Sequence, residues 1–323
     1  MQIPISEPLI SAAHERIRSY VHRTALQTCQ SINDTIGCEI IFKTENLQKV
    51  GAFKMRGAMN AALSLSADDL KKGLATHSSG NHAQALSLAA RTLGVPAYIV
   101  MPRTSPRQKV EAVTGYGGQI TFCEPNLAAR ESTLESIIEE TGATFIHPFD
   151  NWDVITGQAT AAKELIEDAG HLDAIVAPVG GGGLLSGTAL SGKFYAPETE
   201  VYGAEPEGAA DAVLSFASGQ IEPAPYIQTI ADGLLTTLSS KTLEVIRAEV
   251  RQILLVSDSD IVEAMRLLLE RSKLVVEPSG AASLAAVWRH RELFANRRVG
   301  VIISGGNVDL TQLNDWLSST TRG

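Results

Sequence analysis

The sequence predicts an α/β protein whose open, mainly parallel sheets are covered by helices. Short runs of β-branched and apolar residues alternate with longer stretches of helical periodicity along the 323 residues. Strands that are separated by helices pair in parallel, because each crossover carries the chain across one face of the sheet. Several helical stretches end in glycine, which easily adopts the left-handed conformation that stops a helix.

Eight segments have the length and composition of strands. They are residues 39–45, 97–101, 119–123, 144–148, 174–180, 200–205, 252–257 and 298–306. Helices are expected at residues 81–94, 105–117, 127–142 and 259–273. Ser257 or Asp258 is expected to cap the last helix, because a short polar side chain can accept a hydrogen bond from the first turn. The pattern also allows a discontinuous domain, in which the N-terminal segment folds back onto the C-terminal half.

Composition narrows the class of protein. Hydrophobic residues make up 44% and charged residues 20% of the chain, so the chain can bury a core. The net charge of −9 argues against a nucleic-acid partner, which requires a basic surface. No apolar run is long enough to cross a bilayer, and residues 1–10 lack the basic and apolar regions of a secretory signal. We therefore expect no membrane partner.

The cysteines predict a reducing compartment. Cys29, Cys38 and Cys123 are few and odd in number, and none of them forms a C-x-x-C pair. Neither a disulfide framework nor a zinc site is indicated. The cytoplasm is the simplest location for such a chain.

Lys54 lies in the stretch QKVGAFKMRG, between Phe53 and Met55. Apolar surroundings remove water from a lysine amine and lower its pKa. A neutral amine can attack an aldehyde and form a Schiff base, which makes Lys54 a candidate catalytic residue. The alternative is that the aliphatic part of the side chain packs against its neighbours while the amine reaches water.

A second candidate site is the stretch THSSGNHAQA, which joins an expected strand to an expected helix. Ser78, Ser79 and Asn81 stand at the helix entrance, where free N–H groups and the positive end of the helix dipole favour a carboxylate or phosphate. The alternative is that these side chains only cap the helix.

Four consecutive glycines, Gly180 to Gly183, form a third candidate site. They follow an apolar strand and precede an apolar helix, which argues against a flexible linker. A backbone without Cβ atoms can wrap an anion closely and direct its amides at it. The run therefore predicts a phosphate-binding turn.

Two nucleotide-binding patterns are not met. The dinucleotide pattern G-x-G-x-x-G fails because Leu185 or Ser186 takes the place of its third glycine. The stretch GTALSGKF has the spacing of a phosphate loop, but Phe194 stands where a magnesium-binding Ser or Thr is needed. This stretch also falls inside the expected helix.

Two weaker motifs complete the set. In YGAEPEGAAD, Glu205 closes an expected strand and Asp211 follows six residues later, so two carboxylates and a backbone carbonyl could hold a hard cation. Solvated loop carboxylates are the alternative. In VIISGGNVDL, Ser304 ends an expected strand, which is where ligands lie in open α/β sheets.

Taken in order, the motifs GAFKMRGA, SSGNHAQA, GGGG, TIADGL and SGGN resemble those of pyridoxal-phosphate enzymes of the tryptophan-synthase β fold, fold type II. Within that fold, the chain is most similar to serine racemase and the serine/threonine dehydratases, from about residue 10 to about residue 315. The resemblance implies two twisted, mainly parallel sheets, a large cofactor-binding domain of residues 1–50 plus 150–323, and a small domain of residues 51–149. It also implies a homodimer, and no C-terminal regulatory domain is expected.

The resemblance assigns a role to each motif. Lys54 would attach to the cofactor aldehyde and later remove the substrate α-proton. The remaining cofactor contacts would come from Phe53 and Gly233 near the ring, Asn81 at the ring hydroxyl, Ser304 at the ring nitrogen, and Gly180, Gly181, Gly182 and Gly183 at the phosphate. The substrate would be bound by Ser78, Ser79, His82 and Arg130.

Some details match the racemase-like branch of the family and others the dehydratases. A hydroxyl at Ser79, on the face opposite Lys54, could return a proton to the substrate and cause racemisation. Glu205, the Ala209 carbonyl and Asp211 match the divalent-cation site of that branch, which would hold Mg²⁺, Ca²⁺ or Mn²⁺. The stretch HPFDNWD reads more like the dehydratases.

The predicted function is therefore a pyridoxal-phosphate-dependent ammonia-lyase. Its substrate would be a small β-hydroxy amino acid, namely L-serine, L-threonine or 3-hydroxyaspartate, and its products a keto acid and ammonia. A serine racemase with dehydratase side activity is the close alternative. A nucleotide-binding protein that uses GTALSGK, and a non-catalytic amino-acid-binding relative, are the more distant ones.

Overall fold

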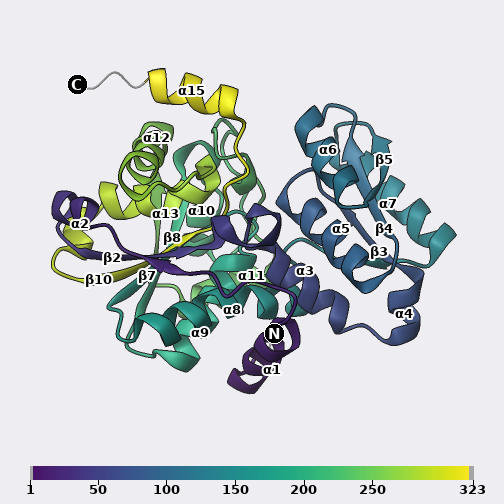
Figure 1. Ribbon diagram of the computed structural model, residues 1–323, viewed down its shortest axis with the longest axis horizontal. Helices are drawn as coiled ribbons and strands as arrows, with labels where there is room; N and C mark the ends of the chain where they lie inside the picture. The colour runs from purple at the N-terminus through teal and green to yellow at the C-terminus, as the bar shows by residue number, and fades with distance from the viewer. Residues whose placement is uncertain (1–2, 320–323) are drawn as a thin grey trace.

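The computed structural model describes residues 3–319, which form two domains, each built on one sheet (Figure 1). The larger sheet has six strands in the order β1-β2-β10-β7-β8-β9, and all its pairs are parallel except β1 with β2. Its strands are β1 (Leu26–Gln27), β2 (Glu39–Thr44), β7 (Ala174–Pro178), β8 (Glu200–Pro206), β9 (Gln252–Val256) and β10 (Arg298–Ile303).

The smaller sheet is entirely parallel and has the order β5-β4-β3-β6. Its strands are β3 (Leu74–His77), β4 (Ala97–Pro102), β5 (Gln119–Cys123) and β6 (Thr144–Phe145). The described residues thus form the two mainly parallel sheets that the sequence predicts. The division of the chain after residues 50 and 149 stays a prediction.

Helices cover both faces of each sheet. Around the smaller sheet they are α3 (Lys54–Leu63), α4 (Ala67–Lys72), α5 (Asn81–Leu93), α6 (Arg107–Gly115) and α7 (Leu127–Thr141). The larger domain carries α1 (Glu7–Ile17), α2 (Gln30–Ile36), α8 (Trp152–Ala169), α9 (Gly183–Tyr195), α10 (Ala212–Ser218), α11 (Ser240–Glu249), α12 (Asp258–Leu267), α13 (Pro278–Arg289), α14 (Arg291–Phe294) and α15 (Leu310–Ser319). Short helical turns are η1 (Glu45–Leu47), η2 (Lys49–Gly51), η3 (Glu207–Ala209), η4 (Asp232–Leu234) and η5 (Leu268–Ser272).

The strand β7 shows why the larger sheet is buried on both faces. All five of its residues are buried. Ala174 and Val176 pack into the core shared with α12 and α13, whereas Ile175 and Ala177 pack into the core shared with α8 and α9. Because side chains alternate between the two faces of a strand, a sheet covered on both sides gives a continuous apolar run.

The expected elements are present with small differences at their ends. Ser257 caps α12 and forms a capping box with Asp260. The helix expected at residues 259–273 changes its hydrogen-bonding pattern at Leu268, where the π-helical turn η5 begins, and it ends at Lys273 with a φ of 61°. The strand expected at residues 144–148 pairs over only two residues.

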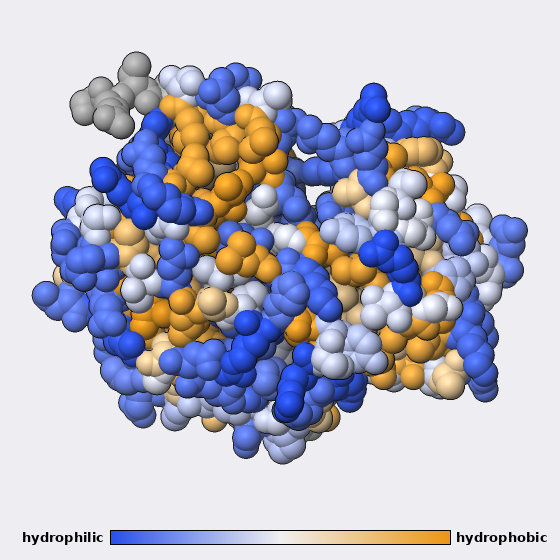
Figure 2. Space-filling model, in the orientation of Figure 1, coloured by the Kyte–Doolittle hydropathy of each residue, from blue (hydrophilic) through white to orange (hydrophobic). Residues whose placement is uncertain are grey.

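The two domains meet at a hollow in the surface, which is visible in the upper part of Figure 2. An ion pair joins the domains, between Lys109 of α6 and Asp232 of η4. In the larger sheet, the carboxyl ends of β7 and β10 lead into the glycine run and into Ser304. None of the helices within residues 3–319 is long and apolar enough to span a membrane.

Candidate active site

Lys54 is the first residue of α3, and the end of β10 fixes its position. The N–H of Phe53 donates to the Ser304 carbonyl over 3.0 Å, and Ala52 forms an isolated bridge with Gly305. The Lys54 Nζ donates to the Pro148 carbonyl over 3.0 Å. The side chain is therefore held between a strand of the larger sheet and the loop that precedes α8.

Burial changes the acidity of this amine. It lowers the pKa of Lys54 from 10.5 to about 8. The aromatic ring of Phe53 contributes to the surroundings, with its centroid 5.0 Å from the Lys54 Nζ. The Lys54 side chain is partly buried and its amine is bound to a protein carbonyl, which supports activation by desolvation. The catalytic role of Lys54 stays a prediction.

The glycine run forms the turn between β7 and α9, and its neighbours leave no room for side chains. A Cβ atom on Gly181 would lie 2.3 Å from the Phe149 ring. A Cβ atom on Gly180 would lie 3.0 Å from the Leu234 Cα and 3.1 Å from the Gly233 carbonyl oxygen. The first-turn N–H groups of α9 have no partner within the helix and point into this turn. This arrangement suits an anion and excludes a flexible linker.

Asn81 begins α5 in the small domain but makes its side-chain contacts with the large one. Its Nδ2 donates to Glu277 Oε1 over 2.7 Å, and its Oδ1 accepts from Asn307 Nδ2 over 2.8 Å. The N-cap of α5 is Gly80, so the polar side chains of Ser78, Ser79 and Asn81 do not serve as the N-cap. These side chains are only partly buried at the entrance of the helix.

His82 is buried, and its role is to connect α5 to the end of β6. Its Nε2 donates to the Ile146 carbonyl over 3.0 Å. Burial lowers the pKa of His82 to about 3, so the ring is neutral at physiological pH. A substrate carboxylate near this residue would therefore meet the helix N-terminus rather than a histidinium charge.

Arg130 lies on α7 next to His77, whose pKa is lowered mainly by burial and also by the Arg130 charge. Its Nε is buried and has no hydrogen-bond partner within residues 3–319. The His77 ring contacts the His147 ring edge-on at 6.2 Å. His147 is adjacent to Pro148, whose carbonyl accepts from the Lys54 Nζ, and the Arg130 charge is near enough to His77 to affect its pKa.

Gly233 and Ser304 are the last two residues to which the resemblance assigns cofactor contacts. The N–H of Gly233 donates to Ser279 Oγ over 2.9 Å, and a Cβ atom on Gly233 would lie 2.9 Å from the same oxygen. The glycine therefore permits close packing on the first turn of α13. Ser304 is buried at the end of β10.

Glu205 and Asp211 form a separate group of buried carboxyls at the end of β8. Glu205 accepts from the N–H groups of Ala212 at 2.6 Å and Val213 at 2.9 Å. The Oδ2 of Asp211 is buried without a hydrogen-bond partner in the described part of the chain. Burial raises the pKa of Glu205 to about 8 and that of Asp211 to about 6.

These carboxyls do not form a metal site from side chains alone. Within the described residues, no group of three or more His, Cys, Asp or Glu side chains could hold a metal ion. The orphaned Asp211 oxygen and the raised pKa values nevertheless fit a cation that also uses the Ala209 carbonyl, because a positive charge would stabilise both ionised carboxyls.

Two site residues were not found from the sequence. His147 accepts at Nδ1 from the Asp150 N–H over 2.8 Å, and burial lowers its pKa to about 4. Glu277 precedes a proline at the start of α13, which in sequence looks like an ordinary helix cap. No local signal distinguishes its contact with Asn81, which lies almost two hundred residues earlier.

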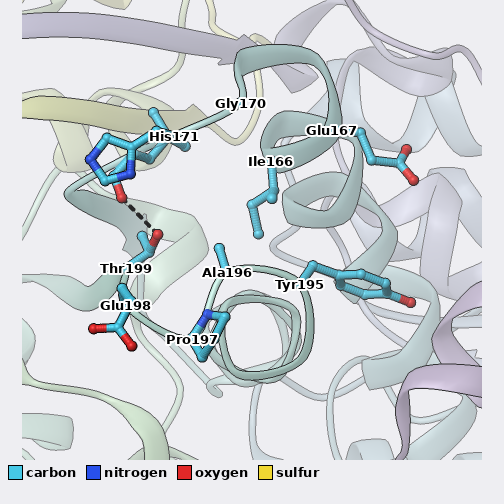
Figure 3. A pocket seen from close by; sticks show the side chains of 10 residues that line it. Ile166, Glu167, Gly170, His171, Tyr195, Ala196, Pro197, Glu198 and Thr199 are labelled. Atoms are coloured by element: carbon cyan, nitrogen blue, oxygen red, sulfur yellow. Dashed lines mark hydrogen bonds between the residues drawn. The ribbon is translucent and has the colours of Figure 1, made fainter.

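A pocket of about 460 Å³ lies away from this site, between the C-terminal ends of α8 and α9 (Figure 3). Thr199 closes one side of it, donating through Oγ1 to the Leu172 carbonyl over 2.7 Å. Its charged side chains include Glu167 and Glu198. It lies beside the residues that enter β7 and β8, at the opposite end of the sheet from Lys54 and the glycine run.

Several known proteins resemble this chain in both sequence and fold. A beta-hydroxyaspartate dehydratase of Paracoccus denitrificans is 48% identical, over 97% of this chain and 99% of the relative. A serine racemase of Dictyostelium discoideum is 47% identical, over 96% of this chain and 97% of the relative. The structure of maize serine racemase superposes with a TM-score of 0.91 at 42% identity, covering 97% of this chain and 96% of that one.

The sequence profile of the family described as "Pyridoxal-phosphate dependent enzyme" matches residues 17–305, which include the motifs discussed above except the last two residues of SGGN. This match spans most of the chain, and the relatives align with nearly all of it. The chain belongs to the family of pyridoxal-phosphate-dependent enzymes.

Proposed function

We propose that this enzyme is an ammonia-lyase that converts a β-hydroxy amino acid into a keto acid and ammonia. The observation that carries the proposal is the Lys54 amine, which burial makes easy to deprotonate. It donates to Pro148, next to the Phe149 ring that packs on the glycine turn, and its charge acts on His82 in the first turn of α5. The cofactor, when bound, supplies an electron sink for the electron pair left at the substrate α-carbon. In the overall reaction, the α-hydrogen and the β-hydroxyl leave the substrate as water. Hydrolysis of the C=N bond of the released product then gives the keto acid and ammonia.

Residues of both domains would hold the cofactor. The glycine turn is closed to side chains and open to a phosphate, while Lys54 offers the amine that attaches to the aldehyde. Asn81 offers a side-chain N–H to the ring hydroxyl, and Ser304 a hydroxyl to the ring nitrogen. Phe53 and Gly233 would lie near the ring.

The same lysine would move the substrate proton. An amine with a pKa of about 8 is partly neutral at physiological pH, so Lys54 can accept the α-proton without a further base. The Pro148 carbonyl orients the Nζ, because it accepts one of its protons.

The substrate carboxylate would bind at the entrance of α5, through N–H groups near Ser78, Ser79 and His82. Arg130 would bind a second carboxylate, since its Nε has no partner within residues 3–319. This feature favours 3-hydroxyaspartate over L-serine and L-threonine, and the beta-hydroxyaspartate dehydratase among the relatives supports that choice.

A serine racemase activity is the second candidate. Ser79 supports it, because a hydroxyl at the α5 entrance could return a proton on the face opposite Lys54, and serine racemases are among the relatives. We expect Ser79→Ala to abolish racemisation while elimination from L-substrates continues. Racemisation that persisted in this variant would show that another group supplies the proton.

We also propose that Glu205, Asp211 and the Ala209 carbonyl bind a divalent cation such as Mg²⁺, Ca²⁺ or Mn²⁺. The unpartnered Asp211 oxygen and the raised pKa values of both carboxyls support this site. A homodimer in the cytoplasm is proposed as well. The three free cysteines are in keeping with a reducing compartment, and sedimentation would measure the oligomeric state.

The decisive experiment is a panel of L-serine, L-threonine and 3-hydroxyaspartate stereoisomers, in which keto acid and the opposite enantiomer are measured together. We expect keto acid from at least one L-substrate, with 3-hydroxyaspartate the best. Formation of enantiomer without keto acid would replace the lyase assignment with a racemase. Arg130→Ala should impair 3-hydroxyaspartate more than L-serine, whereas equal effects would remove Arg130 as the second carboxylate site.

A further inference from the structure

The buried carboxyl of Glu277 has no part in the chemistry described so far. Glu277 is the N-cap of α13 and is only 6% exposed. It has no basic partner in hydrogen-bond contact among the described residues. Its Oε1 instead accepts from Asn81 Nδ2 over 2.7 Å, so a large-domain carboxyl meets a small-domain amide.

Asn81 is fixed from both sides. Its Oδ1 accepts from Asn307 Nδ2 over 2.8 Å, and the same Asn307 Nδ2 donates to the Val50 carbonyl over 2.7 Å. The amide oxygen of Asn81 is thus occupied by a donor, and its nitrogen faces an acceptor. Reversing the amide would set its nitrogen against the Asn307 nitrogen, so Asn307 fixes the orientation of the Asn81 amide.

The backbone is shaped to allow this contact. A Cβ atom on Gly305 would lie 2.1 Å from Glu277 Oε1 and 3.2 Å from Asn81 Nδ2. The N–H of Glu277 donates to the Gly305 carbonyl over 3.2 Å, which ties the start of α13 to the end of β10. Only glycine at residue 305 leaves room for the carboxyl to reach the amide.

We propose that Glu277 is a positioning residue, which holds the Asn81 amide so that its second N–H is directed at the cofactor ring hydroxyl. The inference rests on the proposed role of Asn81 in cofactor binding. One N–H of the Asn81 amide is committed to Glu277, so only the other remains for the ligand. Glu277 contributes an acceptor oxygen, and Asn307 contributes the donor that prevents rotation of the amide.

The electrostatic surroundings keep Glu277 mostly in its neutral form. Burial, together with the Asp232 charge on η4, raises the pKa of Glu277 to about 8. Lys109 on α6 and the hydrogen bond from Asn81 act in the opposite direction. A neutral carboxyl at physiological pH can still accept from Asn81, and it places no negative charge next to the ring hydroxyl.

The test compares cofactor binding to Glu277→Ala, Glu277→Gln and the control Glu200→Gln with the wild-type holoenzyme. Glu200 pairs with Arg297 and is the first residue of β8, at the end of the larger sheet that lies away from the glycine run and Ser304. We expect Glu277→Ala to bind pyridoxal phosphate about tenfold more weakly, because one buried hydrogen bond is lost. Glu277→Gln retains an acceptor oxygen and should stay within about twofold of wild type, as should Glu200→Gln.

Wild-type affinity in Glu277→Ala, or an equal loss in Glu277→Gln, would overturn the proposal. A second measurement decides the matter should the alanine variant not fold. The visible absorbance of the lysine-bound cofactor is expected to change around pH 8 in wild type as Glu277 ionises, and to lose that change in Glu277→Gln. An identical pH titration in both proteins would contradict the inference. Failure of the proposed function is distinguishable, because a wild type that binds the cofactor but forms no keto acid would overturn the lyase proposal and leave the affinity comparison among these variants valid.

Discussion

Lys54 owes its chemistry to groups that are distant in sequence. The Ser304 carbonyl fixes the residue before it, and the Pro148 carbonyl accepts from its amine. An isolated lysine would be charged at neutral pH, whereas burial lowers the pKa of this one to about 8. The apolar neighbours Phe53 and Met55 predict a lowered pKa from the sequence, but the contacts that bury Lys54 come from other elements.

Replacing Lys54 tests the residue directly. We expect Lys54→Ala to lose the visible absorbance of lysine-bound cofactor and to reduce keto-acid formation to background, since both need the amine. Borohydride reduction of wild type followed by peptide mapping should place the pyridoxyl label on Lys54. The control Lys193→Ala removes a surface ion pair with Glu249 and should keep absorbance and activity. A label on another lysine would refute the assignment.

At the scale of elements, the turn between β7 and α9 shows how packing rather than flexibility explains a glycine run. Phe149 lies directly against Gly181, and Leu234 lies against Gly180. The sequence could identify this turn because four glycines between two apolar segments fit few other structures. The apolar helix expected after the turn is α9, whereas α8 and α13 were not among the expected helices. Both of these are buried along most of their length, so they lack the wide polar face that marks a surface helix.

The turn can be tested by adding one methyl group. Gly181→Ala would bring its Cβ within 2.3 Å of the Phe149 ring, so the ring or the turn must move. We expect cofactor affinity to fall by at least about tenfold, as the phosphate loses aligned N–H donors. Gly115→Ala is the matched control, because nothing lies within 4 Å of its added Cβ. Titration of the apoprotein with pyridoxal phosphate measures both, and equal affinities would exclude the turn as a phosphate site.

The buried carboxyls of Glu205 and Asp211 should make the stability of the protein depend on pH. The pKa of Glu205 is raised from 4.5 to about 8 in the folded protein, so the folded state holds a proton that the unfolded state has released. The stability of the cation-free protein should therefore fall as the pH rises from about 4.5 to about 8. A divalent cation selective for the native state should oppose this loss.

Thermal unfolding at several pH values with EDTA or Mg²⁺ measures the effect. We expect Mg²⁺ to raise the melting temperature at pH 8 by at least roughly 2 °C. In Glu205→Gln both the pH dependence and the response to Mg²⁺ should shrink. A response to Mg²⁺ of unchanged size in that variant would place the cation elsewhere.

At the scale of the whole molecule, a buried charge network joins the start of α3 to the larger domain. Arg56 donates to both Glu45 oxygens at 2.7 and 2.8 Å and to both Glu164 oxygens at 2.8 and 2.7 Å. Lys43 adds a donor to Glu164 at 2.7 Å. Burial alone would raise the pKa of Glu164, but hydrogen bonds from His14 and Arg56 hold it well below its ordinary value.

Removing one charge from this network should destabilise the fold. Glu164→Gln leaves Arg56 and Lys43 short of negative charge in the interior, which we expect to cost about 3 kcal/mol in the free energy of unfolding. Asp168→Asn on the same helix is the control, because its carboxylate pairs with Arg23 at the surface and its loss should lower the free energy of unfolding by less than about 1 kcal/mol. Denaturant unfolding measures both variants, and equal small losses would contradict a structural role for the network.

The sequence by itself determined the α/β class, the order of the strands along the chain and the motifs that mark a pyridoxal-phosphate enzyme, and the family and the fold were confirmed. Those features are local, because periodicity, glycine runs and caps are encoded by neighbouring residues. The tertiary structure alone decided that Glu277 meets Asn81, that His147 approaches Lys54, and that Arg56 lies between two carboxylates. Such contacts depend on which strands become neighbours. In the order β2-β10-β7, adjacent strands are far apart in the sequence, and no local pattern predicts that they pair.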